Sequence, residues 1–348
     1  MLPLVFLILA AAPSAVAVDK PAGIVGTAEA CITGRTVDGD TADVKIGART
    51  ERLRLLDIDT EESHNSVAKK ITPFGLETAA WTKSYIEMGG PCWVEYGPER
   101  KDVYDRTLAF LWIKKDGAWQ NYNLETVKRG YAPYFTKYGY SHNHHAEFAA
   151  AQKEAQEKNL GVWDPSNEGN LRGTYLGPTG LIAWWNERAD SLAAYEKEGR
   201  MRPDILDTRM HWELIRDRAG ESVTVFTAIR NADEKGAGWV GKCEGKLYQP
   251  YEIVAKNGES TVEDALKKSV GKYRYFAGKV ALSEDRKTLR MEIANVADIS
   301  ATPPPKPGTK AATPAKPATA AKPATATKSK PSATPKPAAS SKKTSASR

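Results

Sequence analysis

Residues 52–63 read RLRLLDIDTEES, and their alternating apolar residues predict a β-strand that ends in acids. Four carboxylates and one threonine close this run. A second stretch, TVDGDTADV at residues 36–44, places three further carboxylates and a glycine within another β-like pattern. Carboxylates that crowd together repel each other unless a cation neutralises them. The two stretches together therefore predict a metal site at the ends of two strands.

The residues around these stretches predict an α+β unit from about residue 23 to residue 165. β-like patterns over 23–44 and 51–58 come first. The patterns that follow predict a helix over 74–88, two strands within 92–120 with Asp116-Gly117 as a hairpin turn, a helix over 122–129, and a helix over 141–159 with Ser141 as its N-cap. This order is typical of a small OB-like β-barrel with three helices packed on it.

Several motifs occur in the order in which they occur in one known family. They are VDGDT (37–41), RLRLLDIDTEE (52–62), FGLETAAWTKSYI (74–86), DVYDRTLAFLW (102–112), LETVKRGYAPY (124–134) and AAQKEAQEKNLGVWDP (150–165). In this order and spacing they resemble the staphylococcal-nuclease-like (thermonuclease) family. The resemblance implies a small barrel with three helices that hydrolyses DNA and RNA phosphodiesters with Ca²⁺ and leaves 3′-phosphate ends.

The resemblance also implies a set of metal ligands. Asp40 and Asp59 match the two carboxylates that hold the ion, and Thr60 matches the residue that lends its main-chain carbonyl oxygen. Calcium is a hard cation that prefers oxygen ligands, so this donor set suits it. Asp38 and Asp43 are interpreted as turn or surface acids, whereas Asp57 either supports the metal site or forms a structural salt bridge.

Catalytic residues follow from the same match. Arg54 and Arg106 match the two catalytic arginines, whose planar guanidinium groups can each meet two phosphate oxygens. Glu62 matches the residue that orients or activates the attacking water. The family usually has proline before this glutamate, and Glu61 stands there instead. A second carboxylate in this loop leaves open whether Glu61 or Glu62 handles the water.

Two tyrosines are candidate substrate contacts. Tyr104 resembles a nucleotide-contacting tyrosine of the family, and Tyr138, or alternatively Tyr140, supplies another from the loop before the last helix. Plain loop packing is the other interpretation of each. The sequence SHNHH at 141–145 also permits a different hypothesis, a histidine site for zinc or another transition metal.

The chain continues beyond this unit into a linker and a second β-rich segment. GLIAWWNERADSLAAYEKEG at 180–199 predicts an amphipathic helix within a linker over 170–200. Residues 205–300 show short β-like runs, the first of them MHWELI at 210–215, with a helical insert at 261–270, a pattern that resembles an OB-type (OB-like) barrel. Five aromatic residues either stack on bases or fill the core: Trp239, Tyr248, Tyr251, Tyr273 and Tyr275.

Residues 1–17, MLPLVFLILAAAPSAVA, are interpreted as a signal peptide, with an uncleaved anchor as the alternative. A secreted, periplasmic or cell-surface location is expected. The chain has three cysteines, so at most one internal disulfide can form. Cys31 and Cys92 lie on predicted strands, where they form either that disulfide or two buried thiols.

The end of the chain, residues 301–348, contains nine lysines, one arginine and no acid. The whole chain carries +7, so residues 1–300 carry −3 and this segment +10. Its Lys, Pro and Ala content predicts a disordered, extended polycation. Such a tail can bind nucleic acid or an anionic cell surface through counterion release, or it is a solvated spacer.

These observations predict a secreted Ca²⁺-dependent nuclease whose partners are DNA, RNA or both. No protein partner is evident, and a monomer is expected. The alternative is a catalytically inactive nucleic-acid-binding or surface-associated module that keeps the barrel without the chemistry.

Overall fold

The computed structural model describes residues 19–64, 71–171, 180–235, 238–246, 248–255, 260–284 and 287–306. The predicted signal peptide (1–17), part of the predicted linker (172–179) and all but the first six residues of the predicted tail lie outside the described residues.

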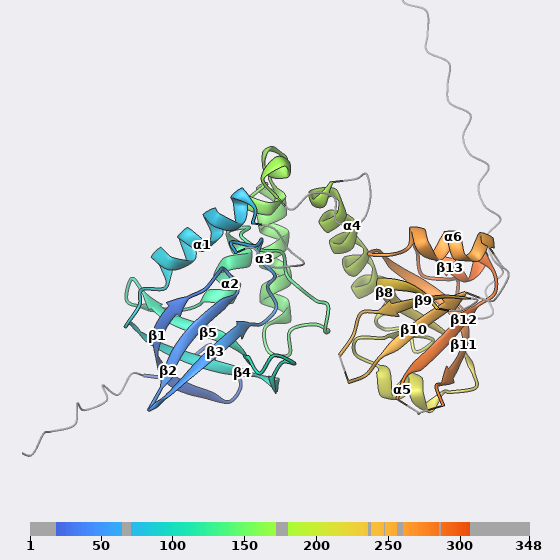
Figure 1. Ribbon diagram of the computed structural model, residues 1–348, viewed down its shortest axis with the longest axis horizontal. Coiled ribbons are helices and arrows are strands. Elements are labelled where there is room, and N and C mark those ends of the chain that lie inside the picture. Colours follow the sequence, from blue (N-terminus) through green and yellow to red (C-terminus); the bar gives the residue numbers. More distant parts are fainter. Residues whose placement is uncertain are drawn as a thin grey trace, which may run out of the picture. The chain divides into compact units, whose positions relative to one another are not determined.

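The first part of the chain forms a β-barrel with helices beside it (Figure 1). Its elements are β1 (Ala28–Thr36), β2 (Thr41–Ile46), β3 (Arg49–Leu55), α1 (Pro73–Tyr85), β4 (Pro91–Lys101), β5 (Thr107–Lys115), β6 (Ala118–Asn121), α2 (Tyr122–Lys128) and α3 (His145–Glu157). The strand order is β3-β2-β1-β4-β5-β6, and the sheet closes because β3 also pairs with β5, in parallel. The predicted small barrel with helices is confirmed.

Local sequence explains where these elements begin and turn. Thr72 caps α1 by accepting a hydrogen bond from the Gly75 amide, and Pro73 occupies the first helical position, where a missing N–H costs nothing. Asp116 and Gly117 both have positive φ and form the predicted hairpin turn between β5 and β6. The last helix begins at His145 rather than at the predicted Ser141, so Ser141 is not its N-cap.

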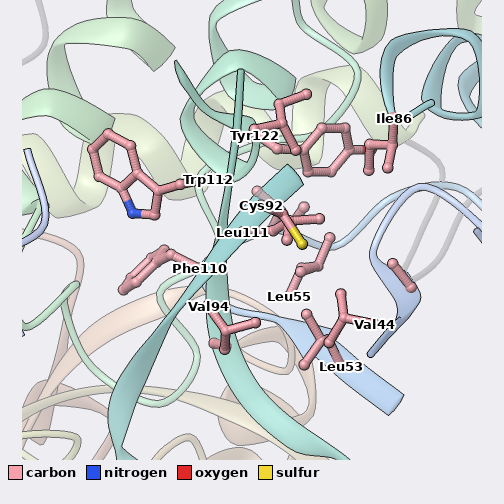
Figure 2. Close-up of a cluster of buried hydrophobic side chains, with 14 of the residues drawn as sticks. Val44, Leu53, Leu55, Ile86, Cys92, Val94, Phe110, Leu111, Trp112 and Tyr122 are labelled. Atoms are coloured by element: carbon pink, nitrogen blue, oxygen red, sulfur yellow. The ribbon is translucent and has the colours of Figure 1, made fainter. Parts of the chain in front are cut away.

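The barrel core is made by side chains of neighbouring strands (Figure 2). Leu53 and Leu55 of β3 are 0% and 1% exposed, and Leu111 of β5 is 0% exposed. Successive residues of a strand point to opposite faces. Phe110 accordingly points away from Leu111, and its ring packs 6.0 Å from that of Phe148 on α3. Strand β5 is thus buried on both faces. Because β3 pairs with β5, this packing also holds β3 in place.

Cys31 and Cys92 form a disulfide between β1 and β4. The two residues are direct partners in the antiparallel register, with Cα atoms 4.9 Å apart, so no backbone distortion is required to join them. Of the two arrangements left open by the sequence, the paired one is present. Cys243 remains a buried free thiol.

The second part of the chain starts with α4 (Leu181–Ala194) and a π-helical turn (Tyr195–Gly199) that together match the predicted helix over 180–199. A second barrel follows. Its elements are β7 (Ile205–Asp207), α5 (Trp212–Asp217), β8 (Ser222–Lys235), β9 (Gly238–Cys243), β10 (Tyr251–Ala255), α6 (Ser260–Lys268), β11 (Tyr273–Leu282), β12 (Leu289–Ile293) and β13 (Ile299–Ser300). The stretch MHWELI, expected as a strand, contains α5 instead.

This barrel repeats the connectivity of the first. Strand β8 pairs with β9 and β11, β9 pairs with β10, and β10 pairs in parallel with β12. Helix α6 lies between the third and fourth barrel strands, as α1 does in the first barrel. This is the strand order of an OB-type barrel.

The aromatic residues of the second barrel mostly fill its core. Trp239, Tyr251, Tyr273 and Tyr275 are between 1% and 3% exposed, so their faces are not available for stacking on bases. Tyr248 is different, with 62% exposure. Among the described residues, no helix has the length and apolar character needed to cross a membrane.

Candidate functional site

The site forms where the β1–β2 turn meets the end of β3. The Leu55 amide donates to the Asp40 carbonyl oxygen over 2.8 Å, and the Tyr122 hydroxyl donates to the Gly39 carbonyl oxygen over 2.9 Å. Gly39 has no room for a Cβ, which would lie 2.6 Å from a methyl carbon of Thr60. The glycine of VDGDT therefore allows the turn to pack against the segment that follows β3.

Arg54 lies between Asp40 and Asp59, the two carboxylates predicted to bind the metal. Its Nη1 is 3.0 Å from Asp40 Oδ2, and its Nη2 is 3.3 Å from Asp59 Oδ1. All three side chains are largely buried, with exposures of 12% to 17%. Two carboxylates that meet one guanidinium converge on one region of space. The structure therefore brings together three residues that the sequence places at 40, 54 and 59.

The electrostatics of this cluster are dominated by burial and by its acids. Burial opposes the charge of Arg54, but Asp40, Asp59 and Asp38 together raise its pKa above the ordinary value. Burial and the neighbouring Asp40 charge raise the pKa of Asp38 to about 7. Asp38 also accepts a hydrogen bond from the Asp40 amide over 3.1 Å, so it shapes the turn as predicted for a turn acid. Three carboxylates thus act on one guanidinium in this cluster.

The segment after Asp59 is fixed against α1. The Thr60 amide donates to Asp40 Oδ2 over 3.3 Å, and the Glu62 carbonyl oxygen accepts from the Thr72 amide over 3.0 Å. Gly75 is needed at the start of α1 because a Cβ there would lie 2.2 Å from the Glu62 carbonyl oxygen. Glu61 is 3% exposed, whereas Glu62 is only partly buried.

Arg106 and Tyr104 lie on the connection between β4 and β5. The Arg106 guanidinium is held by Asp102, whose Oδ2 is 2.7 Å from both Nε and Nη2. Tyr104 is 77% exposed, and the Arg106 guanidinium lies 5.5 Å from the centre of its ring. The parallel register pairs Arg54 with Leu108, two residues after Arg106. Arg106 thus lies directly before β5, the strand that pairs with β3, and Asp102 rather than Asp40 or Asp59 orients its guanidinium.

Asp102 was not anticipated from the sequence. Its four-residue spacing to Arg106, in the motif DVYDR, is the signal that could have found it, because side chains at this spacing also meet across a tight loop. Tyr138 and Tyr140 are separated by their environments. Tyr138 is 47% exposed and adds a small contribution to the raised pKa of Arg54, whereas Tyr140 is partly buried and its ring centre stacks 4.3 Å from that of His145.

Asp43 and Asp57, the other acids of the two stretches, have different surroundings. Asp43, whose side chain is 17% exposed, accepts a hydrogen bond from Arg52 Nε over 2.8 Å. Asp57 adopts a positive φ of 62°, and burial raises its pKa to about 7. Its carbonyl oxygen accepts from the Phe135 amide over 2.8 Å. Asp57 therefore anchors the loop that leads to Tyr138.

The histidine cluster does not offer a zinc site. His144 Nε2 is 3.0 Å from Glu95 and its Nδ1 is 2.8 Å from Glu147, so both ring nitrogens are engaged. His145 Nδ1 is 3.0 Å from the Tyr134 hydroxyl. Within the part of the chain that the structure describes, no group of three or more His, Cys, Asp or Glu side chains could by itself hold a metal ion.

The Asp40 and Asp59 carboxylates nevertheless fit calcium. They are hard oxygen donors, and they already converge on a cation, the Arg54 guanidinium. A phosphate beside them would add further negative charge that a single guanidinium cannot neutralise. A divalent ion held by two carboxylates, one carbonyl oxygen and waters would meet this need.

Comparison with known proteins shows to which family the chain is similar. The family model described as staphylococcal nuclease homologue matches residues 52–165. The chain is 31% identical to the thermonuclease of Staphylococcus intermedius over 136 residues, which is 39% of this chain and 77% of that protein. It is 31% identical to the thermonuclease of Staphylococcus hyicus over 130 residues, 37% of this chain and 72% of the relative.

A third relative is a much longer protein. Endonuclease YhcR of Bacillus subtilis is 32% identical over 142 residues, which is 39% of this chain but 11% of that protein. The relatives and the family model indicate the same family. The barrel, in which Asp40 and Asp59 converge on Arg54, is consistent with it. The chain belongs to the family of staphylococcal nuclease homologues.

Proposed function

We propose that this protein is a Ca²⁺-dependent nuclease that hydrolyses phosphodiester bonds of DNA, RNA or both. Its family and its relatives, two named thermonucleases and one named an endonuclease, support a hydrolase of this kind. The single observation that carries the proposal is the contact of Arg54 with both Asp40 and Asp59. This contact joins two carboxylates that can bind a metal ion to a guanidinium that can bind a phosphate.

The arginines suit the charge that develops during hydrolysis. A phosphodiester under attack gathers negative charge on its equatorial oxygens, and prearranged cations stabilise that charge. Arg54 is restrained by burial, and Arg106 by Asp102. Asp40, Asp59 and the Thr60 carbonyl oxygen would hold calcium, which would supply further positive charge beside the phosphate. Restrained guanidinium groups lose little entropy when they meet the phosphate.

Glu62 is proposed to orient the attacking water. It is only partly buried, and its backbone is fixed by Thr72. The deeply buried Glu61 is the competing candidate. Glu62→Gln should lower kcat, and Glu61→Gln should change kcat less, when each is assayed on single-stranded DNA. Loss of activity in Glu61→Gln alone would reverse these roles. Release of 3′-phosphate ends is proposed from the family resemblance.

We further propose that the protein is exported and acts outside the cytoplasm as a monomer. The Cys31–Cys92 disulfide supports this location, because such bonds persist in oxidising compartments. Tyr104 and Tyr138, both exposed, are proposed to contact nucleotides. The basic segment 301–348 is proposed to retain the enzyme on nucleic acid or on an anionic cell surface.

A chelator-controlled digestion tests the activity. Purified protein is incubated with single-stranded DNA and with RNA in the presence of Ca²⁺, and again after addition of EGTA. The proposal predicts cleavage that EGTA abolishes and that added Ca²⁺ restores. Binding of the same strands without chelator-sensitive cleavage would instead support the inactive binding module.

A further inference from the structure

Two loops of the first barrel carry the exposed residues Tyr104 and Tyr138, and residues of the second barrel contact both loops. One is the β4–β5 connection with Tyr104 and Arg106, and the other is the segment before α3 with Tyr138. The chain up to Pro304 is one unit, so these contacts lie within it. The family model ends at residue 165, before the first element of the second barrel, and so does not account for that barrel.

The first contact acts on the turn that presents Tyr138. The Thr136 carbonyl oxygen accepts from the Gly139 amide over 3.1 Å, which closes the turn around Tyr138. The same oxygen accepts from Arg209 Nη1 of the second barrel over 3.0 Å. The Arg209 guanidinium also lies 4.8 Å from the centre of the Tyr140 ring. One cation therefore touches the turn at its closing hydrogen bond and again two residues beyond Tyr138.

Arg209 is itself rigidly held. It is 1% exposed, and its Nε donates to Asp207 Oδ1 over 2.9 Å. Its Nη1, the atom that reaches Thr136, also lies 3.0 Å from the Tyr273 hydroxyl. A buried guanidinium with fixed partners has little freedom to follow a moving loop. The turn is thus anchored to the core of the second barrel.

The second contact acts on the connection that carries Tyr104 and Arg106. Glu99 lies near the end of β4, three residues before Asp102, which orients Arg106. Its carboxylate accepts from the Tyr248 hydroxyl over 2.5 Å and from Lys246 Nζ over 2.8 Å. Both partners come from the segment between β9 and β10 of the second barrel. The one exposed tyrosine of that barrel's aromatic set is therefore used at this contact.

From these contacts we infer that the second barrel positions the two substrate-contacting loops, with Arg209 and Glu99 as positioning residues for nucleic-acid binding. The inference rests on the proposed function, because it concerns the same site. Loops that are ordered before binding do not lose that freedom when the strand binds, so affinity rises. Loss of one contact is expected to weaken strand binding by about threefold to tenfold while the chemical step is retained.

A direct role of Lys246 and Tyr248 in binding phosphate makes the opposite prediction. Glu99→Gln removes a negative charge near the site and frees Lys246, so direct contact predicts tighter binding of a polyanion. Positioning predicts weaker binding, because the loop loses an anchor. Tyr248→Phe removes one hydroxyl without changing charge. Glu29 provides a matched control, since it also accepts from a tyrosine hydroxyl, Tyr96 at 2.6 Å, but within the first barrel.

The experiment uses the full chain and the variants Glu99→Gln, Tyr248→Phe and Glu29→Gln. Dissociation constants for a fluorescein-labelled single strand are measured by anisotropy in EGTA, where the strand stays intact. KM and kcat are then measured with Ca²⁺, and amide hydrogen exchange is followed over residues 102–106. Glu99 and Glu29 side chains are 37% and 36% exposed, so the two substitutions are comparable at the surface.

Positioning predicts that Glu99→Gln and Tyr248→Phe raise the dissociation constant and KM by the same factor, retain kcat and speed exchange over 102–106. Glu29→Gln should change none of these. Unchanged or tighter binding in Glu99→Gln, or unchanged exchange, overturns the inference. If the wild-type chain does not cleave DNA, the proposed function fails, but the anisotropy and exchange results still decide whether the second barrel positions the loops.

Discussion

At the scale of single residues, Arg54 and Arg52 provide a matched pair. Arg54 contacts Asp40 and Asp59, whereas Arg52 is exposed and pairs with Asp43. Arg54→Lys keeps the charge but loses the planar fork that meets two oxygens, so kcat is expected to fall by about 100-fold. Arg52→Lys should leave kcat within twofold. Steady-state cleavage of single-stranded DNA measures both, and equal effects would place the catalytic arginine elsewhere.

The sequence indicated which residues lie together best where several of them follow a family order. Asp40, Arg54 and Asp59 converge because the two stretches that carry them end at neighbouring strands. Asp102 and Arg209 could not be identified in this way. Asp102 contacts Arg106 through the local geometry of a loop. Arg209 contacts Thr136, which is 73 positions away in the sequence, and periodic patterns do not predict contacts at that separation.

At the scale of secondary-structure elements, the disulfide between β1 and β4 should contribute strongly to stability. Its two cysteines are 61 positions apart, and closing a loop of this size restricts the unfolded chain by about 4 kcal/mol in the chain-entropy account. Reduction with dithiothreitol should therefore lower the free energy of unfolding by about this amount in urea titrations. The Cys31→Ala/Cys92→Ala variant serves as control, because reductant should not change its stability further.

The buried Glu95 links β4 to the start of α3 and should make stability depend on pH. Burial opposes its charge, but hydrogen bonds from His144, Trp112 and the Gly26 amide lower its pKa from 4.5 to about 2. Its contribution is thus present above pH 4.5 and lost as pH falls toward 2. His144 has a raised pKa despite burial, so its contribution is full below pH 6.5 and lost at higher pH.

The comparison of Glu95→Gln with the wild-type chain tests this pair. The difference in unfolding free energy should be about 3 kcal/mol between pH 4.5 and 6.5 and should shrink on either side. Glu147→Gln is the control, because Glu147 contacts the same imidazole but its side chain is 59% exposed. A difference that stays constant from pH 3 to pH 9 would show that this pair is not the titrating group.

Elements with a clear period were predicted well, and short mixed segments were not. The helix over 180–199 matches α4 and its π-helical turn because its apolar residues recur at helical spacing. MHWELI was expected as a strand, but α5 forms because Trp212 and Ile215 are three positions apart and both are buried. Six residues cannot separate the two periods, so packing decides.

At the scale of the whole molecule, charge is divided between an acidic body and a basic end. Residues 307–348 carry eight lysines and one arginine, and they lie outside the described residues. If about half of these cations meet phosphates, deleting 307–348 should reduce the slope of log affinity against log salt by about 3 on single-stranded DNA. An unchanged slope would leave the segment as a spacer.

Barrel closure was the part of the fold that the strand patterns could not specify. The parallel pairs β3–β5 and β10–β12 join strands that are distant in sequence, and no turn signal marks them. The first barrel was nevertheless predicted through its family resemblance. The prediction of the second barrel depended only on the number of short β-like runs. Its strand pairing and its contacts with the loops of the first barrel could be seen only in the structure.

The central claim is that Asp40 and Asp59 hold the ion on which cleavage depends, beside Arg54. A calcium titration of the initial rate of DNA cleavage tests it most directly, in the wild-type chain and in Asp40→Asn, with Asp43→Asn as a control because Asp43 pairs with Arg52 instead of Arg54. The wild-type and Asp43→Asn rates should rise from zero in EGTA and saturate with Ca²⁺, and Asp40→Asn should need far more calcium or stay inactive. Equal rates for all three chains, or cleavage that persists in EGTA, would contradict the account.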